Sequence, residues 1–244
     1  MNEVQEATPI IQVLEQGEIT LRGEMLLGSN YTFLVQVRYQ GEEILAVYKP
    51  TRGEQPLWDF PPGTLAMREV AAYVVSQALG WDLVPPTVYR RRGPLGKGSL
   101  QRFIEHDPEY HYFTFTPEDR QRLRPVALFD ALVNNADRKG GHILFDAEHH
   151  LWLIDHGICF HVEDKLRTVV WDFAGEPIPP EYLKAIEGLS TSLKTASHPL
   201  VSALGTLLSP AEIHALARRA QRLLESGHFP LPPAGRRYYP WPPI

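Results

Sequence analysis

The chain has 244 residues, of which 43% are hydrophobic and 22% are charged, and its formal net charge at pH 7 is −5. A chain of this length can bury a substantial core, and the composition is that of a globular protein rather than a disordered or fibrous one. The acidic balance argues against a nucleic-acid surface. The polar N-terminus, the single Cys159 and the lack of a run of about 18 apolar residues predict a cytoplasmic protein without integral membrane contact.

Residues 18–50 predict three antiparallel strands. Apolar and polar side chains alternate along this stretch, most clearly in YTFLVQVRY, and a period of two is typical of a half-buried strand. A segment rich in Pro and Gly then leads to TLAMREVAAYVVSQALG, which predicts a helix with its N-cap at Thr64 and its C-cap at Gly80. The segments VPPTVYRRR and GSLQRFIEH predict two further strands of the same sheet.

Residues 106–229 are mainly helical in character. TPEDRQRLRPVALFDALVNNA begins with a capping threonine, a proline and two acidic residues, so it predicts a long helix that Pro125 kinks or splits. Two short strands around HILFD and LWLID follow, then a helix from about Pro180 and a last helix that starts in a capping box, SPAE, and ends at Gly227. The tail, residues 230–244, is too rich in proline for a helix and either docks through its aromatic residues or stays extended.

Two short stretches concentrate the residue types that phosphoryl transfer needs. In DRKGGH, Asp137, Lys139 and His142 occupy positions 1, 3 and 6 of a loop after the long helix, and in DHG, Asp155 follows the second short strand. Phosphoryl transfer depends on electrostatic placement more than on covalent help, so cations and a carboxylate-bound metal must surround the triphosphate. The two stretches therefore predict a catalytic loop and a metal loop.

Residues upstream fit the same chemistry. Lys49 ends the third predicted strand in AVYK, and Glu69 lies in the helix that follows. Between the first two strands, Gly28, Ser29 and Asn30 can form a tight turn whose backbone N–H groups approach a phosphate, although a plain hairpin turn explains them nearly as well.

These motifs resemble those of the protein-kinase-like superfamily, which uses Asp-x-Lys-x-x-Asn followed by Asp-Phe-Gly. The Asp-Arg pair is closer to the phosphatidylinositol 3-/4-kinase-like, HipA-like bacterial family. The resemblance covers roughly residues 18–173 and rests on four short motifs. It implies an α+β, bilobal protein-kinase-like fold, in which residues 1–105 form a small antiparallel β lobe with one helix that binds nucleotide. Residues 106–229 would form a larger helical lobe with the catalytic and metal loops, and residues 230–244 a proline-rich tail.

The resemblance also implies a nucleotide site for ATP and Mg²⁺ or Mn²⁺. Lys49, held by Glu69, would contact the α- and β-phosphates, and Asp155 would bind the metal that bridges the phosphates. Backbone groups from Phe103 to Glu105 would meet the edge of the adenine.

On the acceptor side, Asp137 would orient or deprotonate the acceptor hydroxyl and Lys139 would balance charge on the transferred phosphoryl group. Arg138 is expected to brace the loop. Two positions depart from the family pattern. His142 stands where relatives have Asn, and a neutral imidazole binds Mn²⁺ or Zn²⁺ better than Mg²⁺. His156 replaces Phe, so regulation through that ring is not expected.

The acceptor is predicted to be a hydroxyl on a protein or a small molecule. Family resemblance suggests a phosphoinositide, but Lys165 and Arg167 are balanced by Glu163 and Asp164, whereas a polyanionic headgroup requires an excess of cations. The sequence also allows binding of a protein partner.

Several other functions compete with a kinase. The main alternative is a catalytically weak pseudokinase that serves as an ATP-binding scaffold, and another is a kinase-fold enzyme that transfers AMP. A zinc site from His142, His156, Cys159 and His161 lacks the paired spacing of structural zinc motifs. A serine hydrolase is less well supported, because the sequence has no G-x-S-x-G.

Overall fold

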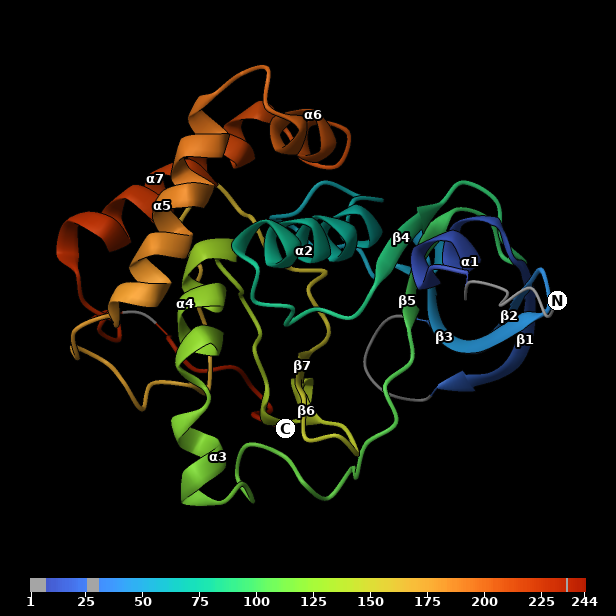
Figure 1. Cartoon of the computed structure of the whole chain (residues 1–244), viewed down its shortest axis with the longest axis horizontal. Coiled ribbons are helices and arrows are strands. Elements are labelled where there is room, and N and C mark those ends of the chain that lie inside the picture. Colours follow the sequence, from blue (N-terminus) through green and yellow to red (C-terminus); the bar gives the residue numbers. More distant parts are fainter. Residues whose placement is uncertain (1–7, 26–30, 236) are drawn as a thin grey trace, which may run out of the picture.

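The computed structural model describes residues 8–25, 31–235 and 237–244. A β-sheet occupies one side of the molecule and most of the helices occupy the other, with α2 (Leu65–Leu79) running between them (Figure 1). The order of elements therefore follows the division expected from the sequence, with strands first and helices after.

Five antiparallel strands form the sheet in the order β1-β2-β3-β5-β4, which confirms the three strands predicted at residues 18–50 and the two that follow. Lys49 lies opposite Ser99 in the pairing of β3 with β5. Gly98 permits this pairing, because a Cβ there would overlap the carbonyl oxygen of Lys49. The strands are β1 (Glu18–Met25), β2 (Thr32–Tyr39), β3 (Glu42–Pro50), β4 (Thr87–Arg90) and β5 (Gly98–Arg102).

The β-rich half contains α2 and a shorter helix, α1 (Ile10–Gln16), that the sequence analysis does not assign. α1 has no side-chain cap, and its helical state depends on burying Val13 and Leu14 against the sheet. α2 ends at Gly80 in the left-handed conformation, as expected. At its start Thr64 holds the N-cap position, but its hydroxyl donates to the carbonyl of Pro61 instead of capping the helix.

The helical half follows the predicted order of elements. The long helix is split, as Pro125 indicated, and the last helix has both the expected capping box and a left-handed Gly227. A short helix, α6, was not expected. The elements are α3 (Pro117–Gln121), α4 (Arg124–Val133), β6 (Ile143–Phe145), β7 (Leu151–Leu153), α5 (Pro180–Lys194), α6 (Pro199–Gly205), α7 (Pro210–Ser226) and the 3-10 turns Thr51–Gly53 and Gly140–His142.

The larger hydrophobic core belongs to the helical half and includes one face of α2. Ala71, Ala72 and Val75 of this helix are fully buried in the same cluster as residues of α4, α5 and α7. α2 is thus fixed to the helical half although it follows the sheet strands in sequence. This packing positions Glu69, on α2, between the two halves.

The tail docks on the body, which is one of the two outcomes expected. The carbonyl of Tyr238 accepts hydrogen bonds from the amide of Thr168 (3.1 Å) and the indole of Trp171 (3.3 Å). The carbonyl of Pro243 accepts from the amide of Gly140 (2.7 Å), so the last residues lie beside β6 (Figure 1). Among the helices of the described residues, none combines the length and apolar character needed to cross a bilayer.

Candidate active site

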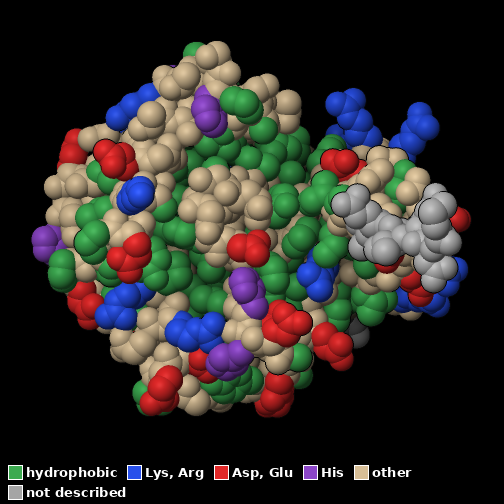
Figure 2. Space-filling view, in the orientation of Figure 1, with side chains coloured by type: hydrophobic (Ala, Val, Ile, Leu, Met, Phe, Trp, Pro, Cys, Tyr) green, Lys and Arg blue, Asp and Glu red, His purple; other side chains and the backbone are tan. Residues whose placement is uncertain are grey.

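Lys49, Glu69 and Asp155 meet at the boundary between the two halves. The Lys49 Nζ lies 2.5 Å from Glu69 Oε1 and 3.0 Å from Asp155 Oδ1. The three side chains come from the end of β3, from α2 and from the loop after β7, so distant parts of the chain converge here. In the view of Figure 2, acidic, basic and histidine side chains lie close together near this boundary.

The charges of these three groups stabilise one another. Burial by itself would lower the pKa of Lys49, but the carboxylates of Asp155 and Glu69 outweigh burial and raise it. The Lys49 ammonium in turn holds the pKa of Asp155 well below its usual range. Lys49 and Asp155 are therefore both ionised at neutral pH. The side chain of Asp155 is 49% exposed, so one face of its carboxylate is open to a ligand.

The expected catalytic loop lies next to Asp155. His142 Nε2 is 3.3 Å from Asp155 Oδ2, and Lys139 Nζ is 3.7 Å from Asp137 Oδ2. Burial raises the pKa of Asp137 to about 6, against the opposing effect of Lys139. Burial also lowers the pKa of His142 to about 4, so its imidazole is neutral at pH 7.

Arg138 braces the loop, as expected from the sequence. Its guanidinium is fully buried and lies 3.0 and 3.2 Å from the two carboxylate oxygens of Asp130 on α4. It also donates to the carbonyls of His142 (3.2 Å) and Ile154 (2.7 Å) and lies 2.7 Å from His156 Nε2. One side chain therefore joins the catalytic loop to the loop of Asp155.

His156 extends this connection to α2. Its ring is buried, and burial lowers its pKa well below the usual value. Because the neutral ring accepts from Arg138 at Nε2, Nδ1 carries the proton and lies 4.0 Å from Glu69 Oε2. The backbone amide of His156 donates to that same Glu69 oxygen (2.9 Å). Glu69 thus holds Lys49 with one oxygen and the Asp155 loop with the other.

Two asparagines hold the start of the catalytic loop, a role that the sequence analysis missed. Asn134 is left-handed (φ 54°) and ends α4, and its amide donates to the carbonyl of His161 (2.9 Å). Asn135 is buried, accepts from the amide of Asp137 (2.9 Å) and donates to Asp130 (3.2 Å). The Asn-Asn pair next to the motif was the available signal, since Asn tolerates the left-handed region.

The expected adenine-binding segment forms the connection between the halves. The amide of Phe103 donates to the carbonyl of Leu45 (3.0 Å), so this amide is engaged within the sheet. Ile104 is buried and packs with Leu144 of β6, and Glu105 is exposed. Adenine recognition by Phe103 and Glu105 stays a prediction. Because the Phe103 amide is engaged, the other backbone groups of this segment would have to contact the adenine.

The expected phosphate-binding turn connects β1 to β2. Gly28, Ser29 and Asn30 lie outside the described residues, so their role stays a prediction. The amide of Tyr31, which follows them, donates to the carbonyl of Gly53 (3.3 Å). The chain after the turn is therefore placed beside the 3-10 turn that follows Lys49.

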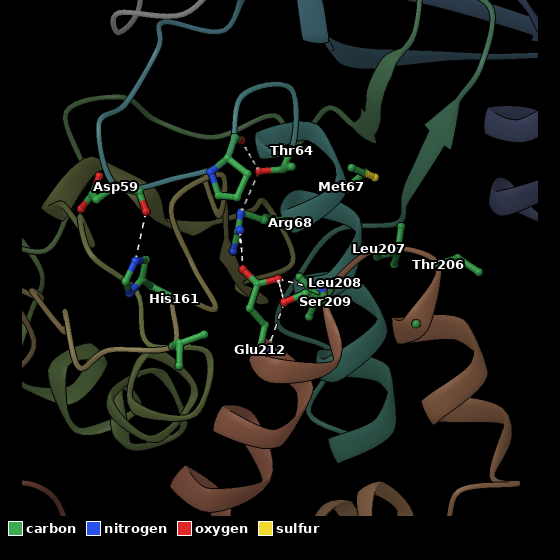
Figure 3. A pocket seen from close by; sticks show the side chains of 13 residues that line it. Asp59, Thr64, Met67, Arg68, His161, Thr206, Leu207, Leu208, Ser209 and Glu212 are labelled. Carbon is green, nitrogen blue, oxygen red and sulfur yellow. Dashed lines mark hydrogen bonds and ion pairs between the residues drawn. The ribbon is translucent and has the colours of Figure 1, made fainter.

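A second set of charges anchors the start of α2. Arg68, also buried, forms an ion pair with Glu212 of α7 and donates to the carbonyl of Cys159 (2.6 Å), as Figure 3 shows for the Arg68–Glu212 pair. A pocket of about 540 Å³ opens beside this pair, and Thr64, Arg68 and Glu212 are among its lining residues. Lys49 and Asp155 are not, so the pocket is separate from the predicted nucleotide site.

Comparison with known sequences finds relatives that include two plant proteins named as kinases. A scan against protein-family models finds no match. Protein Rv2133c of Mycobacterium tuberculosis is 43% identical in an alignment that covers 94% of each chain. Phosphatidylinositol 4-kinase gamma 4 of Oryza sativa subsp. japonica is 31% identical over 77% of this chain, and that of Arabidopsis thaliana is 27% identical over 61%. The matches span only 39% and 34% of the length of these two plant proteins.

Comparison with solved structures shows a kinase-like bilobal fold. The crystal structure of the Helicobacter pylori proinflammatory kinase CtkA matches with a TM-score of 0.56, covering 88% of this chain and 95% of that one at 11% identity. The predicted fold class is therefore confirmed. The HipA-like part of the resemblance is not confirmed by these comparisons. At 43% identity over 94% of both sequences, the chain belongs to the same family as Protein Rv2133c of Mycobacterium tuberculosis.

Proposed function

We propose that the protein is an ATP-dependent phosphotransferase of the phosphatidylinositol 3-/4-kinase-like type, acting on a hydroxyl group of a protein or small molecule. The observation that supports this most directly is the position of Lys49 between Glu69 and Asp155. One ammonium faces two carboxylates there, which leaves an excess negative charge at the boundary between the halves. A divalent metal held by Asp155 would offset this charge, and Lys49 would then be available to the phosphates of a nucleotide that shares the metal.

The donor atoms near Asp155 fit a metal that is shared with a nucleotide. Asp155 offers carboxylate oxygens and His142 a neutral imidazole nitrogen. In the described residues, no group of three His, Cys, Asp or Glu side chains could hold a metal by itself. Mg²⁺ is commonly bound by one or two carboxylates together with substrate phosphates, and Mn²⁺ also accepts imidazole. The metal, when bound, would neutralise charge on the phosphates.

Asp137 is suited to receive the proton of the acceptor. Its side chain is 31% exposed, and with a pKa of about 6 it is mostly ionised at neutral pH yet more basic than an ordinary aspartate. The acceptor oxygen would form a bond to the γ-phosphorus as the bond to the β-phosphate oxygen breaks, ADP would leave, and the acceptor proton would pass to Asp137. Lys139, 3.7 Å away, would balance the charge on the transferred group.

The surroundings of the segment after Asp155 favour a protein or small-molecule acceptor over a polyanionic headgroup. Lys165 lies 2.9 Å from Asp59 and 3.8 Å from Glu163, so its charge is already neutralised. Phosphatidylinositol, suggested by the names of the plant relatives, is therefore a secondary candidate. His142 favours the second candidate function, a weakly active ATP-binding scaffold, since it replaces the Asn expected in the catalytic loop.

The proposal is tested by measuring ATP consumption with Mg²⁺ and with Mn²⁺ in the wild type, Asp155→Ala and Asp137→Ala. We expect nucleotide binding to depend on Asp155 and turnover to depend on both. Asp164→Ala, which removes a surface carboxylate paired with Arg222, is the matched control and should leave both unchanged. Mass spectrometry of the product separates phosphate transfer from AMP transfer. A wild type that binds nucleotide with metal but transfers nothing to any acceptor or to water would establish the scaffold instead.

A further inference from the structure

The C-terminal segment, defined here as residues 237–244, lies against the catalytic loop. The carbonyl of Pro243 accepts a hydrogen bond of 2.7 Å from the amide of Gly140, which lies between Lys139 and His142 in the chain. Gly141 faces the same segment, because a Cβ added at Gly141 would lie 4.0 Å from the side chain of Ile244. The segment therefore contacts the turn that connects two of the predicted site residues.

Gly140 is held from a second direction by the body of the protein. Its carbonyl accepts from the amide of Tyr112 (3.3 Å), and a Cβ at this position would lie 2.9 Å from the ring of Phe113. Only glycine fits without a shift of that ring. The Gly140 carbonyl is thus bound by the amide of Tyr112, and the Gly140 amide by the carbonyl of Pro243. Removal of either partner would leave one of these two backbone groups without its hydrogen bond.

The other end of the segment is attached to residues 167–169, which pair with the predicted catalytic loop at Arg138. The amide of Thr168 donates to the carbonyl of Tyr238 (3.1 Å), and the hydroxyl of Thr168 donates to Asp130 (3.0 Å). Residues 167–169 pair with Arg138 through hydrogen bonds of 3.0 and 3.1 Å. The segment therefore bridges residues 167–169, which pair with Arg138, and the Gly140 turn, and both adjoin the loop that carries the predicted base, Asp137.

The segment leaves the reactive groups accessible. With it in place the side chain of Asp137 is 31% exposed and that of Asp155 is 49% exposed. Its prolines restrict the free chain and so reduce the entropy lost on docking. A segment that is docked beside the site without covering it is suited to shape the loop rather than to block it.

We propose that residues 237–244 are a positioning segment of the active site that holds the Gly140 turn, and through it Asp137, Lys139 and His142, in the geometry needed for transfer. The role in catalysis rests on the proposed phosphotransferase function. The segment would act on the rate of the chemical step and not on ATP affinity, since Lys49 and Glu69 lie outside its contacts.

The test compares the full chain with a chain that ends at Trp241 and a chain that ends at Gly235, using ATP turnover with water as the acceptor. Loss of the hydrogen bond from Gly140 to Pro243 should lower kcat about fivefold to tenfold in the chain that ends at Trp241. The chain that ends at Gly235 also loses the two hydrogen bonds to Tyr238 and should show at least this decrease. The KM for ATP should stay within about twofold in both chains. Leu231→Ala is the matched control, because this side chain is 68% exposed and lies outside residues 237–244, and it should leave kcat unchanged. An unchanged kcat in the truncated chains would overturn the proposal, and an increase would show an inhibitory segment instead.

Hydrogen–deuterium exchange separates this proposal from the proposed function. The Gly140 amide should exchange at least about tenfold faster in the chain that ends at Trp241 than in the full chain, because it loses its acceptor. Equal exchange in the two chains would overturn the role of the segment even if the protein is an active kinase. An inactive wild type with a protected Gly140 amide would instead refute the phosphotransferase and with it the catalytic role, while the docking of the segment stands.

Discussion

Replacement of Arg138 by Met should strongly destabilise the protein, whatever reaction it catalyses. The side chains of Arg138 and Asp130 are both 0% exposed, and the two carboxylate oxygens of Asp130 lie 3.0 and 3.2 Å from the guanidinium. Arg138→Met leaves the Asp130 carboxylate buried with only the neutral donors Thr168 and Asn135. It also removes the donors to the carbonyls of His142 and Ile154.

The size of the loss follows from the burial of the pair. Removing one partner of a buried ion pair costs about 3–5 kcal/mol, because the remaining charge is left without compensation. For a chain of this length each kcal/mol lowers Tm by about 2–4 °C, so we expect Tm to fall by about 6–20 °C. Asp130→Asn in the Arg138→Met background should restore part of this loss, since it removes the unpaired charge.

Thermal unfolding followed by circular dichroism at pH 7 measures this difference. Arg222→Met is the matched control, because it breaks an ion pair with Asp164 in which the two side chains are 59% and 46% exposed. Exposed pairs contribute at most about 1 kcal/mol, so the control should shift Tm by less than about 4 °C. If the Tm of Arg138→Met lies within about 2 °C of that of Arg222→Met, the two variants differ by less than about 1 kcal/mol in stability. That result would refute the stabilising role assigned to the buried Arg138–Asp130 pair.

Four further outcomes are expected. Lys49→Met should weaken nucleotide binding by about tenfold or more, as expected for the loss of a charged hydrogen bond, and equal affinity in a titration would contradict the assigned role. Turnover should fall as the pH drops through about 6, because the carboxyl of Asp137, whose pKa burial raises to about 6, must be ionised to accept a proton; a pH–rate profile without an inflection there would count against it. His142→Asn should shift the ratio of Mg²⁺-supported to Mn²⁺-supported turnover toward Mg²⁺, because an amide oxygen replaces an imidazole nitrogen. Burial raises the pKa of Cys159 well above its usual value, so a thiol reagent should react only after unfolding, and prompt reaction of the native protein would contradict the buried placement.

The features that were predictable from the sequence have local signals. Alternation of side chains identified the first three strands, and Gly80 and Gly227 marked the ends of two helices because both adopt the left-handed conformation. Pro125 marked the break in the long helix because it has no amide to donate. Each of these signals acts within a few residues of the element that it specifies.

The features that escaped prediction depend on contacts between distant residues. α1 has seven residues and no side-chain cap, so only its packing against the sheet makes it helical. In the sequence, Asp130 is a single polar residue in an apolar helix. Its role as the buried ion-pair partner of Arg138 is evident only from the structure. The hydrogen bond between the Gly140 amide and the Pro243 carbonyl joins residues about a hundred positions apart, and such a contact leaves no periodic pattern in the sequence.

A continuous series of polar contacts connects the two halves of the molecule. It runs from Lys49 to Glu69, then through His156 and Arg138 to Asp130. Kinase activation is commonly a matter of bringing the strand lysine and the helix glutamate together. Here Lys49 and Glu69 are in contact, and the buried face of α2 fixes this helix to the helical half, which limits its freedom to move away from the strand lysine. Control of turnover is therefore expected at nucleotide or acceptor binding, and not at the assembly of this pair.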